Sequence, residues 1–294
     1  MTVFLQFLFS GLTIGSVYAL VGLGFNVIYN ATSIINLAQG EFVVIGGLVM
    51  WFFTESMKMP FAVAVLLTLL VAGVVALLME RLAIKPLKKT DLLLMIMITV
   101  AVSIVLRGLL MFKFGKDSYG YDPFTDGEPL QIHGAIIQQQ TLWIIGLTCL
   151  CIVLMYLFFN RTLLGKAMRA CAVNPTAARL VGIDVEKMVM LSFVLSAVMG
   201  AIAGIAITPL SLMEYDNGPM LTVKGFSAAI MGGLGRGRGS VLGGFLIGIL
   251  ESMTAGYIHS GLKDAVALLI MLAVLFFRPA GLFGSKTALR MRKF

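Results

Sequence analysis

The feature that most constrains this chain is a series of long apolar segments separated by short clusters of charge. Hydrophobic residues make up 59% of the 294 residues and charged residues 12%, whereas soluble domains carry roughly 25% charged residues. Several apolar segments are long enough to cross a hydrocarbon core of roughly 30 Å as helices. The pattern predicts an all-α polytopic membrane protein, with one transmembrane domain over residues 1–294 and no soluble domain.

We expect about eight to nine transmembrane helices, because each crossing needs roughly 20 apolar residues. The expected spans are residues 3–29, 33–54, 60–79, 92–112, 141–159, 188–213, a short glycine-rich segment that begins at 224, 241–255 and 264–277. The first 15 residues lack a basic region and a small-residue cleavage site, so we expect a membrane helix there and not a cleaved signal.

Three basic stretches, residues 81–91, 161–187 and 278–294, indicate the orientation. Nine crossings with the N-terminus outside put all three on one side, as the positive-inside tendency expects. Eight crossings, with the glycine-rich segment re-entrant, would move the last stretch to the other side. We therefore expect a cytoplasmic C-terminus and an external linker at 114–140, whose charges are mostly acidic.

The net charge of +8 does not by itself indicate nucleic-acid binding, because the cations gather in short loops, where anionic lipid of the bilayer is the expected partner. Cys149, Cys151 and Cys171 lie in or beside apolar spans and are expected to pack, not to form a disulfide or metal site. His133 and His259 have no acidic or cysteine companions at ligand spacing. No metal or cofactor is therefore expected.

Polar residues interrupt the second span at its start, in the sequence SIINLAQGEFVVIGG. Charged side chains at membrane depth are costly and usually face a bundle interior or a water-filled path, and a glycine beside them is typical of a broken helix. Asn36, Gln39, Gly40 and Glu41 are therefore our candidates for the translocation path. The alternative is that they hydrogen-bond neighbouring helices or cap a break.

The glycine-rich segment that begins at 224 resembles the second span in being short and glycine-interrupted, and the two would enter the membrane from opposite sides. Such pairs point to the central path of a transporter and to a possible inverted pseudo-repeat of half-helices. Arg107 and Glu251 are further charges inside spans, and they could pair with each other, meet a partner chain or reach the interface. Otherwise we expect no charged central cavity.

The longest polar stretch of helical character covers residues 161–187 and reads LLGKAMRACAVNPTAARLVGID at its centre. Pro175 just inside a helix start and Gly182 after its end predict a short helix. It could lie on the membrane surface or dock onto another protein. The chain has no Walker A sequence, so we expect no enzyme activity of its own and any ATP hydrolysis in a separate subunit.

The pattern G-K-A-x-R-A-x-A-x-N-P-x-A-A-x-L-x-G-I at 165–183 resembles the cytoplasmic coupling loop of bacterial ABC-importer permeases, specifically the branched-chain amino-acid permease family of the LivH type. Two further blocks agree, GLTIGSVYALVGLGFNVIYNATSIINLAQGEF and KGFSAAIMGGLGRGRGSVLGGFLIGILE. In this resemblance the coupling-loop positions are Gly165, Arg169, Ala170, Asn174, Pro175, Ala177, Ala178, Leu180, Gly182 and Ile183.

The resemblance implies a multi-pass permease subunit of a bacterial inner membrane that imports branched-chain or similar apolar amino acids. It implies a second, homologous permease subunit as partner, two cytosolic ABC ATPase subunits docked on the coupling loops, and a periplasmic or extracellular substrate-binding protein. The helix at 175–182 would seat in a groove of the ATPase.

Three alternatives stay open at this point. Members of the family often have His-Gly-Glu where this chain has Gln39-Gly40-Glu41, and related permeases for urea and short amides share the I-N-x-A-x-G-E pattern, so the substrate could be an amide. An ion-coupled secondary transporter without an ATPase would need Glu41 and Glu251 as coupling carboxylates. A non-transporting membrane scaffold would use the same residues for stability alone.

Overall fold

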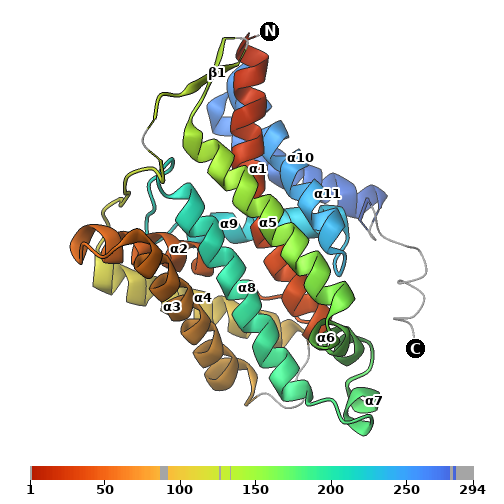
Figure 1. The fold of residues 1–294 in the computed structure, drawn as a ribbon. Coiled ribbons are helices and arrows are strands. Elements are labelled where there is room, and N and C mark those ends of the chain that lie inside the picture. The colour runs from red at the N-terminus through yellow and green to blue at the C-terminus, as the bar shows by residue number, and fades with distance from the viewer. Residues whose placement is uncertain (1, 87–91, 126, 133, 279–280, 283–294) are drawn as a thin grey trace.

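The structure is a computed structural model that describes residues 2–86, 92–125, 127–132, 134–278 and 281–282. Within them the chain is almost entirely helical (Figure 1). The α-helices are α1 (Thr2–Thr32), α2 (Gln39–Trp51), α3 (Phe61–Met79), α4 (Leu92–Phe114), α5 (Gln139–Arg161), α6 (Leu163–Val173), α7 (Pro175–Leu180), α8 (Val185–Ile207), α9 (Gly218–Gly232), α10 (Gly237–Tyr257) and α11 (Lys263–Phe277).

Short elements extend three of these helices or lie in the linker between α4 and α5. π-Helical turns at Phe52–Ser56 and Glu80–Ile84 continue α2 and α3, and a 3-10 turn at Ser260–Leu262 precedes α11. In the linker, β1 (Leu130–Ile132) pairs antiparallel with β2 (Ala135–Ile137). This hairpin lies at the end of the molecule where α1 begins (Figure 1).

Seven helices among the described residues are long and apolar enough to cross a membrane: α1, α3 with its π-helical turn, α4, α5, α8, α10, and α11 with its 3-10 turn. The prediction of an all-α polytopic membrane protein is confirmed. The count of eight to nine is approximate, because α2 and α9 have only 13 and 15 residues. At 1.5 Å per residue, neither can cross the hydrocarbon core alone.

Three predicted boundaries were wrong in and around the glycine-rich segment. The sixth span ends at Ile207 and not at 213, and α9 begins at Gly218, before the expected start at 224. α10 then begins at Gly237 and not at 241. The reason is backbone contact, since a Cβ added at Gly232 would lie only 2.0 Å from the carbonyl carbon of Gly239. Gly232 and Gly239 let α9 and α10 pack closely, whereas Gly233 and Gly235 lie in the turn between them, with φ of +93° and +88°.

α1 forms the centre of the bundle and contacts α5, α8, α9 and α10. Its small-residue face was expected to permit close approach. A Cβ added at Gly248 of α10 would lie 2.4 Å from the Cα of Gly15 on α1, and one added at Gly11 would lie 2.6 Å from the Cα of Ile249. The outer helices instead carry exposed apolar side chains, such as Leu66 on α3 and Phe112 on α4, as expected where lipid replaces water around the protein.

The two short helices enter the bundle from opposite ends (Figure 1). α2 follows the non-helical residues 33–38 at the end of α1, near the side of α6 and α7, whereas α9 follows the turns at 208–217 at the far end of α8. Their N-termini meet, because the Gly40 N–H donates a hydrogen bond to Oγ1 of Thr222 across 2.9 Å. The predicted pair of broken helices is therefore present, in the opposed arrangement expected of an inverted pair.

Candidate functional site

The polar residues at the start of α2 hold the break in the helix. Asn36, Gln39 and Glu41 are all fully buried. Oδ1 of Asn36 accepts a hydrogen bond from the Ala38 N–H across 3.0 Å. Gln39 makes two hydrogen bonds with Ser196 of α8, accepting from its hydroxyl at 2.6 Å and donating to its carbonyl oxygen at 3.1 Å. The Gln39 contacts join α2 to α8, and Asn36 supplies an acceptor for one backbone N–H at the break.

Glu41 joins α2 to α4. Its Oε1 accepts a hydrogen bond from the Ser103 hydroxyl at 2.7 Å and lies 3.9 Å from Nε of Arg107. Its Oε2 is buried without a hydrogen-bond partner among the described residues. The sequence left the partner of Arg107 open, and in the structure that partner is Glu41 and not Glu251.

None of the four path candidates lines the large cavity described below. Their observed contacts are those of the alternative interpretation, in which Asn36, Gln39, Gly40 and Glu41 bond to neighbouring helices and cap a break. A part in translocation stays a prediction for them.

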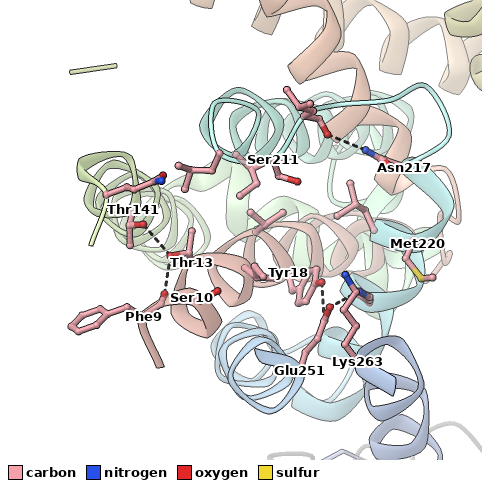
Figure 2. A pocket seen from close by; sticks show the side chains of 18 of the residues that line it. Phe9, Ser10, Thr13, Tyr18, Thr141, Ser211, Asn217, Met220, Glu251 and Lys263 are labelled. Carbon is pink, nitrogen blue, oxygen red and sulfur yellow. Dashed lines mark hydrogen bonds and ion pairs between the residues drawn. The ribbon is translucent and has the colours of Figure 1, made fainter. Parts of the chain in front are cut away.

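A cavity of about 580 Å³ lies between α1, α9, α10, α11 and the start of α5, with β2 and the turn after α8 at its rim. Figure 2 shows Ser10, Thr13 and Thr141 on one side of it and Tyr18, Glu251 and Lys263 on the other. The Thr13 hydroxyl donates to that of Thr141 at 3.3 Å. The remaining walls of the cavity are mainly apolar, so the cavity combines hydroxyl groups, aliphatic surface and charge.

The charge in the cavity forms one cluster centred on Lys224. Its ammonium lies 2.7 Å from Oε1 of Glu251 and 2.6 Å from Oδ1 of Asp264. The Tyr18 hydroxyl donates to Oε2 of Glu251 at 2.9 Å. The side chains of Lys224 and Glu251 are only 7% and 4% exposed. Four helices, α1, α9, α10 and α11, thus meet at one set of paired charges.

The sequence analysis expected no charged central cavity, and it did not anticipate this charged cavity at the end of the bundle where α1 begins. Sequence reasoning missed Lys224 because it treated this residue only as the start of the glycine-rich segment. With α9 beginning at Gly218, Lys224 lies in the second helical turn instead. The signal that could have found it was a lysine in a short apolar segment, with Glu251 unpaired in the next one.

The polar segment 161–187 forms two short helices at the opposite end of the molecule (Figure 1). Oδ1 of Asn174 accepts from the Ala177 N–H at 2.9 Å and caps α7, with Pro175 in its first turn. Gly182 has φ of +85° and follows the end of α7, where a left-handed residue is favourable for glycine. The predicted Pro-started, Gly-ended helix is confirmed, although it is only six residues long, Pro175–Leu180.

The two helices are attached to the bundle on one side and exposed on the other. Gly165 packs on the end of α5, where an added Cβ would lie 2.6 Å from the Cα of Phe159. Met168 and Ala178 are buried. By contrast, Leu180 and Val181 are 85% and 76% exposed. Large apolar side chains on a polar segment indicate a surface for a partner.

Other predicted residues of this segment have contacts within the chain. The Arg169 guanidinium donates to the Phe159 carbonyl oxygen, so part of its role is to hold α6 against α5. Cys171 is buried, and this burial raises the pKa of its thiol, as fits a packing residue. Cys151 is also buried, whereas Cys149 is exposed. His133 lies outside the described residues.

An all-helical membrane bundle with opposed half-helices, a cavity at one end and an exposed helical segment at the other is an arrangement suited to a membrane permease. Residues 7–275 match the family described as branched-chain amino acid transport system / permease component. The chain belongs to this family of ABC transporter permeases.

Named relatives cover the chain almost completely. It is 28% identical to the high-affinity branched-chain amino acid transport system permease protein LivH of Escherichia coli K12, and 30% identical to the corresponding protein BraD of Pseudomonas aeruginosa. In both cases 96% of each chain is covered. The solved structure PsaBC from Streptococcus pneumoniae in complex with Fab aligns with 99% of this chain and 96% of its own, at a TM-score of 0.49 and 14% identity.

Proposed function

We propose that this chain is the permease subunit of an ATP-driven importer that moves branched-chain or similar apolar amino acids across the inner membrane. The single observation that carries the proposal is the exposed α6–α7 segment at the end of the bundle opposite the cavity, in a chain whose family is that of ABC permeases. Substrate would enter at one end while ATP hydrolysis acts at the other.

The substrate class is supported by the relatives and by the cavity. LivH and BraD are named for branched-chain amino acid transport. The cavity has aliphatic walls, including Ile14, Val17 and Leu221, against which a branched side chain can pack. Amides and urea lack the paired charges that the Lys224 cluster could meet, which favours amino acids.

The coupling role is supported by the exposed residues of α7 and by the contacts that attach α6 and α7 to α5 and α8. Their exposed residues, Leu180 and Val181, could enter a groove of an ATPase, where burial of their apolar surface would favour association. Gly165 packs on α5, and α7 leads directly into α8 through Asp184, whose Oδ1 accepts from the Lys187 N–H at 3.2 Å. A force on α7 would therefore reach two membrane helices.

The partners and the orientation follow from the same proposal. The complete importer would contain a second homologous permease subunit, two ATPase subunits and an external substrate-binding protein. With α6 and α7 in the cytoplasm, the hairpin and the N-terminus are outside, and the chain direction of α11 takes the C-terminus to the cytoplasm. Residues 283–294, which end the chain, lie outside the described residues.

The experiment that tests the coupling role is co-purification of the chain with its candidate ATPase subunits. The variant is Arg179→Glu with Leu180→Asp, and the matched control is Ile136→Asp, an apolar residue of the hairpin that is 52% exposed at the opposite end. Because loss of a central interface anchor costs about 2 kcal/mol or more, we expect the first variant to lose the ATPases and the control to keep them.

Retention of the ATPases by both variants would contradict the assignment of α7 as the contact. If no ATPase binds even the unaltered chain, the importer proposal fails as a whole. Each variant is checked by size-exclusion chromatography in detergent, so that loss of binding is not confused with loss of the membrane fold.

A further inference from the structure

We propose that the cluster of Lys224, Glu251 and Asp264 is a binding site for the charged groups of a zwitterionic amino acid. The ammonium of the ligand would pair with the carboxylates, and its carboxylate with Lys224. This inference rests on the proposed function for the direction of transport, but the binding itself does not depend on ATP or on the coupling helices.

The cluster is open to a ligand on one side. Asp264 is 38% exposed and lies at the cavity wall together with Lys263. A lysine ammonium has three N–H donors, and its two carboxylate partners account for two of them at 2.7 and 2.6 Å. The Tyr18 ring lies 5.4 Å from the Lys224 ammonium, so a carboxylate that enters the cavity would pair with Lys224 in place of Asp264 or of this ring contact.

The balance of charge favours a zwitterion over a singly charged or neutral ligand. Lys224 and Lys263 set two positive charges against the two negative charges of Glu251 and Asp264 on the cavity wall. A zwitterion adds one charge of each sign, so ion pairs can be exchanged without leaving any charge unpaired. A cation or an anion would add an uncompensated charge, and a neutral amide would offer no charge to exchange.

A purely structural role explains the position of these charges less well. Burying ion pairs in a membrane is costly, and replacing such pairs by apolar residues of similar volume is often neutral or stabilising. Joining α9, α10 and α11 therefore does not require Lys224 and Glu251. Their location on the wall of a cavity, and not in the packed core, indicates that the charges serve what enters it.

Cavity size and shape agree with a small aliphatic amino acid. Small-molecule sites typically have volumes of roughly 300–1,000 Å³, and this cavity has about 580 Å³. Ile14, Val17 and Leu221 lie along it and offer aliphatic surface next to the charged cluster. The ligand class that combines both features is a zwitterionic amino acid with an apolar side chain.

Binding at this cluster would act on a half-helix. Lys224 lies two residues after Thr222, whose hydroxyl accepts the hydrogen bond from Gly40 at the start of α2. A ligand that draws Lys224 away from Glu251 therefore pulls on α9 close to its junction with α2. This gives a physical route from substrate binding to movement of the broken helices.

The experiment measures protection of a cysteine in the cavity. Ser10 is exposed and lines the cavity wall, so Ser10→Cys is introduced in a chain whose three native cysteines are replaced by alanine. Membranes that contain the full chain are treated with a maleimide without ATP. We expect millimolar leucine to slow labelling roughly fivefold, as for a site that is mostly occupied, whereas isocaproamide, isoamylamine and isocaproate leave the rate unchanged.

The double variant Lys224→Met/Glu251→Gln removes both buried charges while keeping similar side-chain volume, and we expect it to abolish protection by leucine. The matched control is Lys58→Met/Glu55→Gln, which removes a surface pair at 2.8 Å, close to the 2.7 Å between Lys224 and Glu251, and should keep full protection. If the double variant does not fold, Asp264→Asn at the half-exposed rim takes its place and should weaken protection.

Equal protection by isocaproamide, or full protection in the Lys224 or Asp264 variant, would overturn the inference. The result is independent of the ATPase test above. Protection by leucine together with failed ATPase binding would reject the importer proposal and keep the site, whereas ATPase binding without protection would do the reverse.

Discussion

Gly40 of α2 and Thr222 of α9 join two half-helices at their N-termini, through a hydrogen bond of 2.9 Å from the glycine N–H to the threonine hydroxyl. The approach is so close that a Cβ on Gly40 would lie 2.0 Å from the carbonyl oxygen of Gly218. Glycine is required here by space and not by conformation. The N-terminal ends of both helices carry partial positive charge, and the Glu41 carboxylate lies beside Gly218 at this junction.

Replacing Thr222 by valine should destabilise the protein, because the buried Gly40 N–H then has no acceptor, at a cost of about 1–3 kcal/mol. Thr148→Val is the matched control, since the hydroxyl of Thr148 is buried without a hydrogen-bond partner among the described residues. We expect thermal unfolding in detergent to show a lower Tm for the first variant and an equal or higher Tm for the second. Equal Tm values for Thr222→Val and the unaltered chain would contradict this account.

The losses of stability caused by single substitutions at the ion cluster should not add up in the double variant. Lys224→Met alone leaves the buried Glu251 carboxylate without its cation, which costs about 3–5 kcal/mol. Lys224→Met/Glu251→Gln removes both charges and should be more stable than the single variant. Thermal unfolding of both single variants and the double variant gives the coupling free energy, and a value near zero would mean that the pair does not interact.

Replacing glycine by alanine should have opposite effects on stability at the α1–α10 contact and at an open position on α4. Gly248→Ala places a Cβ 2.4 Å from the Cα of Gly15, and overpacking of this kind costs about 1–3 kcal/mol. Gly108→Ala on α4 meets no atom within 4 Å and should stabilise its helix by up to about 1 kcal/mol. Yield of folded protein and Tm should fall for the first variant only.

Loss of the cap on α7 should uncouple the importer without affecting its membrane fold. Asn174→Ala removes the acceptor for the Ala177 N–H, at a cost of about 1 kcal/mol to the short helix, whereas Asn174→Ser keeps a capping oxygen. We expect lower ATP-driven uptake for the alanine variant, partial or full recovery for serine, and unchanged Tm for both. An uptake rate insensitive to all three residues at this position would argue against α7 as the coupling element.

The amino-acid sequence by itself determined the properties that depend on neighbouring residues. The length of a transmembrane span is set by the thickness of the hydrocarbon core, so the lengths of the apolar segments indicated where the chain can cross the membrane. Asn174, Pro175 and Gly182 act within a few residues of one another, so the start and end of α7 were predictable. The break before α2 was predictable for the same reason, because Gly40 and its polar neighbours interrupt a single apolar run.

Only the tertiary structure decided which distant side chains meet. Arg107 pairs with Glu41, and Lys224 pairs with Glu251 and Asp264, because helix packing brings these positions together. The boundaries of α9 and α10 also depended on packing, since the close contact of Gly232 with Gly239 divides the expected glycine-rich segment between the end of one helix and the start of the next. The charged cavity follows from both facts. Sequence patterns describe the face and length of each helix, but charges that are far apart in the chain find their partners only when helices from both halves assemble around α1.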